Sequence, residues 1–449
     1  MSLIDKISKK FILYILTFFS IATILSLSST PENLFNNNLI KNNFYENILF
    51  FKSTLPIIIF ASLVLVNFKE LKVSLLTKNN FIFSFFSLLI LFQIIGTLSN
   101  PQNYFKNLYY IIPEMNIMLI SLVFLKIYNK KFLNFYFNSN LIVFFLIFLY
   151  FFFIYAKYYL LFNDNFYSVW GSIENKEAVP RPTGMARLAI IFSLYFFCIY
   201  VLYKKKYIFF LIFFNYAIFA FQSRMVILAL LFITLIFILI KERYSIVKTI
   251  KYLILIIIIP FIISLVIDIS KREILFNDRI FNSEIYSKND RIFNSEIYSK
   301  NFRILNSEIY SSNFTSNRKQ DWQNILRNFD KAKVFGYGIH GDRILINQTA
   351  SNGFLYSLVS GGYLAMITYC VICIYSFYLV NLALLKKKFD KYSWFASSMI
   401  IFFLIRSLVE NSFTIISFDF IIFFLSIYYL EKIFFIKSKS NIKSINKYK

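Results

Sequence analysis

Glycine, proline, cysteine and histidine are scarce in this chain, whose 449 residues include 9 glycines, 7 prolines, 3 cysteines and one histidine. The sequence has no D-x-D, H-E-x-x-H or paired C-x-x-C motif, so it predicts neither a metal centre nor a cofactor. It also lacks a GxxxxGK[ST] loop, which argues against a nucleotide-driven reaction. Cys370 and Cys373 have C-x-x-C spacing, but they lie in an apolar run and are interpreted as small residues of a membrane helix.

Acidic residues are also few: 23 stand against 48 lysines and arginines, which gives a formal net charge of +25. A nucleic-acid-binding protein gathers its basic residues on a folded soluble domain, and this sequence has no such domain. The basic residues lie instead in short loops between apolar runs, where they orient a membrane protein. We therefore expect no nucleic-acid partner.

The chain is instead rich in long apolar runs. It is 58% hydrophobic and has a mean hydropathy of +0.62, which is too apolar for a soluble protein. Runs of roughly 17–25 apolar residues are long enough to cross a hydrocarbon core about 30 Å thick as helices. They are continuous and not alternating, which excludes a β-barrel.

The sequence thus predicts an all-α integral membrane protein with about twelve transmembrane helices and one large extramembrane loop domain containing short amphipathic helices. We expect about nine spans in 1–268, the loop domain in 269–352, about three spans in 353–435 and a basic tail in 436–449. The predicted spans centre on 11–28, 48–67, 81–98, 108–127, 141–162, 184–203, 207–222, 225–240, 250–268, 353–384, 393–409 and 413–435. The first run has no cleavage motif and is expected to remain as the first span.

Lysine and arginine in the short loops predict that both termini are cytoplasmic. With the N-terminus on that side, the basic clusters of the other short loops and the lysine-rich tail fall there too. The opposite side receives 30–47, 163–183 and 269–352.

A twelve-residue repeat lies within the loop domain. Residues 277–288 read NDRIFNSEIYSK, 289–300 repeat this letter for letter, and 301–312 read NFRILNSEIYSS. Twelve residues do not return to one face of a helix, and the period is shorter than the common solenoid units. We interpret the repeat as a tolerated loop expansion. The alternative is that its arginines, Arg279, Arg291 and Arg303, contact an anionic substrate.

The segment 317–362 collects the rare residues, including six of the glycines and the only histidine. Asn317 with Gln320 forms a variant of the capping box, and apolar residues then recur at helical spacing around Trp322. This pattern predicts a short amphipathic helix at the membrane interface, which ends in the glycine-rich turn 335–342.

Several polar and ionisable residues are candidates for a site. Arginine offers a planar, permanently charged fork that suits phosphate oxygens, so arginines converging on one membrane face would bind pyrophosphate. The alternative is that each arginine snorkels to the interface. The candidate substrate-binding residues are Arg181, Arg224, Arg318, Arg343, Asn352 and Arg406. The candidate catalytic bases are His340, Asp342 and Glu410; Glu410 is also placed to form an ion pair with Arg406, four residues before it.

Five stretches, taken together and in order, resemble the O-antigen ligase/O-antigen polymerase family of bacterial envelope proteins. They are RPTG at 181–184, SR at 223–224, R-x-x-x-W at 318–322, FGYG at 335–338 and SNGFLYSLVSGG at 351–362. The resemblance covers roughly residues 170–415, and the first five spans match the family only in hydropathy.

The resemblance implies metal-independent glycosyl transfer at the periplasmic face of the bacterial inner membrane, from glycan carried on undecaprenyl pyrophosphate. Arginines would stabilise the departing pyrophosphate, and a base would deprotonate the attacking sugar hydroxyl. It also implies membrane lipids and a chain-length regulator as partners, within lipopolysaccharide biosynthesis.

One departure from the family pattern separates two activities. Ligases of this family share a His-Asn pair after the long loop, where this chain has Ser351 and Asn352. We therefore favour a polymerase that joins repeat units over a ligase that transfers glycan to lipid A-core. A lipid-linked-oligosaccharide flippase or another transporter would also have about twelve spans. Such proteins carry broken helices and polar groups near the midplane, whereas this chain has its polar residues at one face and in one loop, which argues against transport.

Overall fold

The computed structural model describes most of the predicted spans. The described residues are 9–26, 50, 53–65, 81–100, 104–126, 130–162, 169–170, 173, 179–203, 207–241, 246–267, 318–329, 334–346, 350–385, 390–414 and 417–445. The twelve-residue repeat, with Arg279, Arg291 and Arg303, lies outside them.

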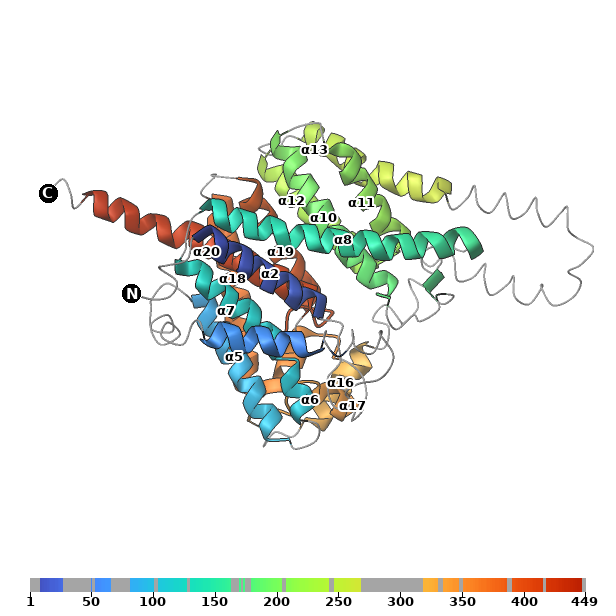
Figure 1. The fold of residues 1–449 in the computed structure, drawn as a ribbon. Helices are drawn as coiled ribbons and strands as arrows, with labels where there is room; N and C mark the ends of the chain where they lie inside the picture. Colours follow the sequence, from blue (N-terminus) through green and yellow to red (C-terminus); the bar gives the residue numbers. More distant parts are fainter. Residues whose placement is uncertain are drawn as a thin grey trace, which may run out of the picture.

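The described residues form helices and connecting turns, with no strand among them (Figure 1). The N-terminal helices are α2 (Lys9–Ser26), α5 (Phe81–Leu98), α6 (Tyr104–Tyr109), α7 (Ile112–Lys126) and α8 (Lys130–Phe162). The central helices are α10 (Pro182–Tyr203), α11 (Ile208–Ala220), α12 (Arg224–Lys241), α13 (Ile246–Leu253) and the π-helix η2 (Ile254–Ile258). The C-terminal helices are α16 (Arg318–Asn328), α17 (Gly341–Ile346), α18 (Gly353–Leu385), α19 (Lys391–Ser407) and α20 (Phe418–Ile445).

Six helical stretches in the described part of the chain are long and apolar enough to cross a membrane. They are Phe81–Leu98, Asn134–Leu160, Pro182–Leu202, Arg224–Lys241, Thr249–Ile267 and Gly353–Leu385. Three shorter apolar helices lie at Tyr14–Ile24, Ser53–Leu65 and Ile208–Ala220. The prediction of an α-helical, multi-pass membrane protein is therefore confirmed, while the number of twelve spans stays a prediction.

Two helices, α18 and α10, each pack against several others. Helix α18 packs against α5, α19 and α20, while α10 packs against α8, α11, α12 and α19. Phenylalanine fills much of the space between α5 and α20: the fully buried Phe86 ring meets Phe420 and Phe424 edge-on, each at 5.4 Å between centroids. This core fixes the helices from which the candidate site is built, and α16 and α17 (orange in Figure 1) cover one end of the bundle.

The very short turn between α11 and α12 is as tight as its sequence predicts. Gln222 has a positive φ of 51°, and Arg224 is already the first residue of α12. A left-handed residue reverses the chain within a few residues, so the two apolar helices can pack against each other.

Candidate functional site

The predicted amphipathic helix and glycine-rich turn are both present, as α16 and the turn 334–340 that leads into α17. This turn packs against a break in α18 that the sequence interpretation, which treated 353–384 as one continuous span, missed. At the break Gly362 has φ 72° and ψ −164°, a conformation essentially restricted to glycine. The broken helix leaves carbonyls available, and the Tyr337 and Gly338 N–H groups donate to the carbonyls of Val359 and Ser360 at 2.7 and 3.0 Å.

The turn also packs against the end of α5. The Ile339 N–H donates to the Thr97 hydroxyl at 3.1 Å, and the Asn100 side-chain amide donates to the Tyr337 carbonyl at 3.2 Å. A Cβ on Gly96 would lie only 2.3 Å from the Phe335 carbonyl oxygen, so only glycine allows this close approach. The glycine-rich turn is thus fixed between α5 and α18.

Asn352, a predicted substrate-binding residue, caps α18. Its Oδ1 accepts from the N–H groups of Phe354 and Leu355 at 2.8 and 3.1 Å. Its Nδ2 donates to the Leu408 carbonyl at 2.8 Å. The cap therefore holds the start of α18 beside the segment 408–414, which follows α19 and carries Glu410.

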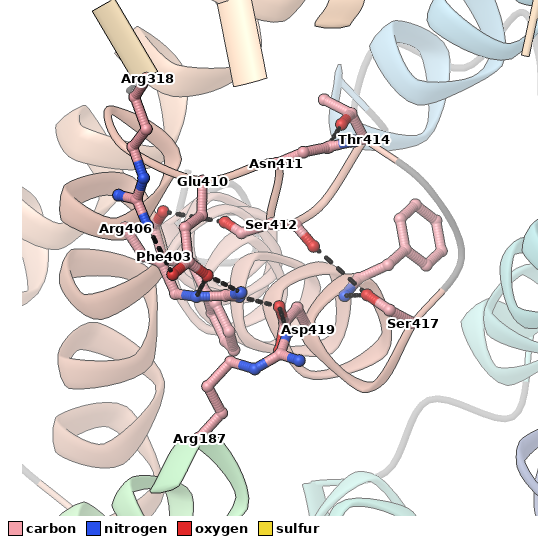
Figure 2. Close-up of polar contacts among 11 residues, drawn as sticks. Arg187, Arg318, Phe403, Arg406, Glu410, Asn411, Ser412, Thr414, Ser417 and Asp419 are labelled. Carbon is pink, nitrogen blue, oxygen red and sulfur yellow. Dashed lines mark hydrogen bonds and ion pairs between the residues drawn. The ribbon is translucent and has the colours of Figure 1, made fainter. Parts of the chain in front are cut away.

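Three arginines and two carboxylates from five parts of the chain meet at this segment (Figure 2). We call Arg187, Arg318, Arg406, Glu410 and Asp419 the arginine network. Arg406 donates to Glu410 Oε2 through Nε at 3.0 Å and Nη2 at 2.5 Å, and through Nη1 to Asp419 Oδ2. Arg187 Nη1 donates to the same Asp419 oxygen at 3.1 Å, and Arg318 Nη2 lies 3.5 Å from Glu410 Oε1.

The network has a buried centre and a partly exposed rim. The side chains of Arg406 and Asp419 are 5% and 4% exposed, whereas those of Arg187, Arg318 and Glu410 are 33%, 28% and 27% exposed. Three guanidinium groups and two carboxylates leave one net positive charge. That charge, with two arginines on the rim, makes the rim suitable for binding an anion.

Glu410 lies outside the apolar helices and stays ionised at neutral pH. Burial alone would raise its pKa, but Arg406, Arg187 and Arg318 outweigh that effect and hold the pKa below the usual 4.5. A depressed pKa keeps the carboxylate ready to accept a proton but makes it a weak base.

The same pKa shift predicts an acid-sensitive contribution to stability. Because the pKa of Glu410 is lower in the folded state, its ion pairs stabilise the fold above the unfolded pKa, and this stabilisation is lost as the pH falls through the folded pKa. We expect Glu410→Gln to lower the thermal unfolding midpoint at neutral pH, and the difference from the unmodified protein to vanish well below pH 4.5, where both side chains are neutral. Thermal unfolding in detergent across that range measures this difference, and a difference independent of pH would contradict the assignment.

His340 and Asp342 lie in the turn and in α17. The His340 ring meets the Tyr110 ring edge-on at 5.0 Å, and its backbone N–H donates to the Tyr356 hydroxyl at 3.3 Å. Asp342 is fully buried, and its two oxygens accept from the backbone N–H groups of Ala350 at 2.7 Å and Arg343 at 2.9 Å. Burial raises the pKa of Asp342, and these two N–H groups oppose the rise. Asp342 thereby joins the start of α17 to the segment just before α18, an arrangement that favours a structural role.

Of the predicted substrate-binding arginines, the structure brings Arg318 and Arg406 together in the network. Arg181 is exposed, with its guanidinium 5.4 Å from the centre of the Trp170 ring. Arg224 and Arg343 are also exposed, at the start of α12 and on α17. The ion pairs that define the arginine network involve none of these three side chains.

Sequence reasoning missed Arg187 and Asp419. Both lie near the start of a long helix, Arg187 in α10 and Asp419 in the first turn of α20, within the predicted spans 184–203 and 413–435, where an ionisable residue usually has a partner and a function. That rule would have identified both residues, because each is a rare charge in its run. It would not have paired them, because they are 232 positions apart.

Comparison of the chain with known protein families, curated proteins and solved structures finds no match. The network offers guanidinium groups for phosphate oxygens and a partly exposed carboxylate as a proton acceptor. Among the residues that the structure describes, no group of three or more His, Cys, Asp or Glu side chains could hold a metal ion.

Proposed function

We propose that the chain is a polymerase of O-antigen or a related surface polysaccharide, a metal-independent glycosyltransferase of the bacterial inner membrane. It would transfer glycan from undecaprenyl pyrophosphate to a lipid-linked repeat unit at the periplasmic face. The observation that carries the proposal is the arginine network, in which three arginines from α10, α16 and α19 surround two carboxylates with one positive charge in excess. Such a cluster suits a diphosphate leaving group at a membrane edge.

In this reaction the bond between the sugar anomeric carbon and the pyrophosphate oxygen breaks, and a bond to the acceptor hydroxyl forms. Negative charge develops on the departing pyrophosphate, where Arg318 and Arg187 on the rim would stabilise it. Arg406 holds Glu410 in place and Asp419 holds Arg187, while Glu410 in turn pairs with Arg318. The proton of the acceptor hydroxyl passes to a base, for which Glu410 is nearest to the arginines and His340 and Asp342 remain alternatives.

The proposal includes the topology expected from the sequence: about twelve spans, cytoplasmic termini, and the loop 269–352 in the periplasm. It needs no cofactor, and its partners are the lipid-linked glycan, membrane lipids and a chain-length regulator. Ser351 stands where ligases of the resembling family have histidine, which supports polymerisation over transfer to lipid A-core.

One observation favours a transporter as a second candidate, because the break at Gly362 interrupts α18 and broken helices are typical of transporter sites. In transporters the freed carbonyls coordinate the transported ion or substrate. Here the Val359 and Ser360 carbonyls already accept hydrogen bonds from the glycine-rich turn. The break is thus explained by the docking of the turn, and the polymerase remains the better-supported function.

Complementation with a matched pair of variants tests the proposal. In a host that lacks its own O-antigen polymerase and supplies a matching repeat unit, the chain should restore the lipopolysaccharide ladder. Arg318→Ala removes one rim guanidinium, and we expect polymerisation to fall about 100-fold, the usual effect of losing one transition-state donor. Arg327→Ala, on the same helix but exposed, should leave the ladder intact.

The other outcomes of complementation decide between the alternatives. Glycan restored on lipid A-core in a ligase-deficient host would overturn polymerisation in favour of ligation. Rescue of neither host by protein shown to be inserted in the membrane would favour transport.

A further inference from the structure

An apolar groove of about 570 Å³ opens along α12. Its lining residues are Met225, Leu228, Ala229, Leu231, Phe232, Leu235, Leu253 and Ile405. Six of these come from α12, one from the end of α13 and one from α19. The groove has the size of a small-ligand site, but its lining side chains are all apolar, so it suits a hydrocarbon chain.

Exposure alone does not distinguish this groove from the rest of the lipid-facing surface. Leu228 and Phe232 are 54% and 51% exposed, but Leu146 on α8 is 59% exposed as well. Two features describe the groove: it is concave, and two of its lining residues are next to an arginine in the sequence. Ile405 directly precedes Arg406 of the network, and Met225 directly follows Arg224.

The position of Ile405 connects the groove to the arginine network. Successive residues of a helix point about 100° apart, so α19 presents Ile405 to the groove and Arg406 to Glu410 and Asp419. The part of the groove at Ile405 is therefore one residue of α19 away from a site with one net positive charge. A chain of hydrocarbon with a diphosphate at its end has the matching pattern.

We propose that this groove holds the isoprenoid chain of the lipid diphosphate whose headgroup binds at the arginine network. The identity of the lipid rests on the proposed function, whereas the location of its chain rests on the groove. The lipid would enter sideways from the bilayer along α12 and α13, so its chain never leaves an apolar environment. The diphosphate would then meet Arg318 and Arg187 at the rim.

Photolabelling tests the location directly. The purified full-length chain in lipid nanodiscs is exposed to an isoprenoid diphosphate with a diazirine in its first isoprene units, and labelled peptides are mapped by mass spectrometry. We expect labelling in the α12 peptide and at the end of α19. Leu228→Trp would partly fill the groove, and we expect about tenfold less labelling, equivalent to about 1.4 kcal/mol or the contact of about two methylenes. Leu146→Trp makes the same change at an exposed position on α8 and should leave labelling unchanged.

Three results would overturn the inference: labelling outside α12 and α19, equal loss in both tryptophan variants, or equally strong competition by a neutral glycerophospholipid. These results are separate from the test of the proposed function. Groove labelling without polymerisation would leave the lipid site standing and remove the polymerase. A restored ladder with labelling elsewhere would support the polymerase and refute the lipid site in the groove.

Discussion

Replacing Arg406 by methionine should lower the free energy of unfolding by about 3–5 kcal/mol, because it leaves the buried Asp419 without its closest cation. The Asp419 side chain is 4% exposed, and the Arg187 guanidinium at 3.1 Å is the cation that would remain beside it. Glu410 would keep only the longer contact to Arg318 at 3.5 Å. Methionine keeps much of the apolar length of arginine, so the loss reports on charge and not on packing.

Thermal or denaturant unfolding of the purified protein in detergent measures this effect. Arg327→Met makes the same substitution at an exposed position on α16 and should change stability by less than about 1 kcal/mol. If the two variants lost the same stability, the ion pairs of Arg406 would not hold α19 and α20 together, and the buried centre of the network would be refuted.

Replacing Gly362 by alanine should destabilise the protein by about 3 kcal/mol or more, because two costs add. The backbone at φ 72° and ψ −164° is accessible essentially to glycine alone. A Cβ there would also lie only 1.7 Å from the Val334 carbonyl oxygen. The glycine-rich turn would have to leave the break in α18, which would expose the carbonyls that it now satisfies.

The amount of protein inserted in the membrane and its unfolding midpoint both report this loss. Gly184→Ala is the matched control, because Gly184 lies in α10 and its added Cβ would meet nothing closer than the Pro180 Cβ at 3.3 Å. That change should stay within about 1 kcal/mol of the unmodified protein. Equal behaviour of the two variants would show that the turn does not depend on the break.

The elements that the sequence predicts well are those with a local signal. Continuous apolar length located Gly353–Leu385 and Arg224–Lys241 to within a few residues, because a membrane span needs only enough apolar residues in a row. A cap and apolar residues at helical spacing likewise located α16. Each of these signals lies within one helix and needs no distant partner.

The candidate site could be predicted only in part, because its contacts are distant in sequence. Arg406 and Glu410 are four positions apart, and their pairing follows from helix geometry. The joining of Arg187 to Asp419 and of Arg318 to Glu410 depends on how α10, α16, α19 and α20 pack, which no local pattern states. The glycines predicted a shaped turn, but not that Gly362 breaks α18 to receive it.

Reconstitution with a defined substrate tests the central claim most directly. The purified chain in nanodiscs is incubated with a synthetic repeat unit on undecaprenyl pyrophosphate, in the presence of a metal chelator, and glycan length is followed by mass spectrometry. We predict glycans of two or more repeat units, with free undecaprenyl pyrophosphate released for each new bond, and about 100-fold less product from Arg318→Ala. Repeat units that stay single, under conditions in which an established polymerase lengthens them, would contradict the account.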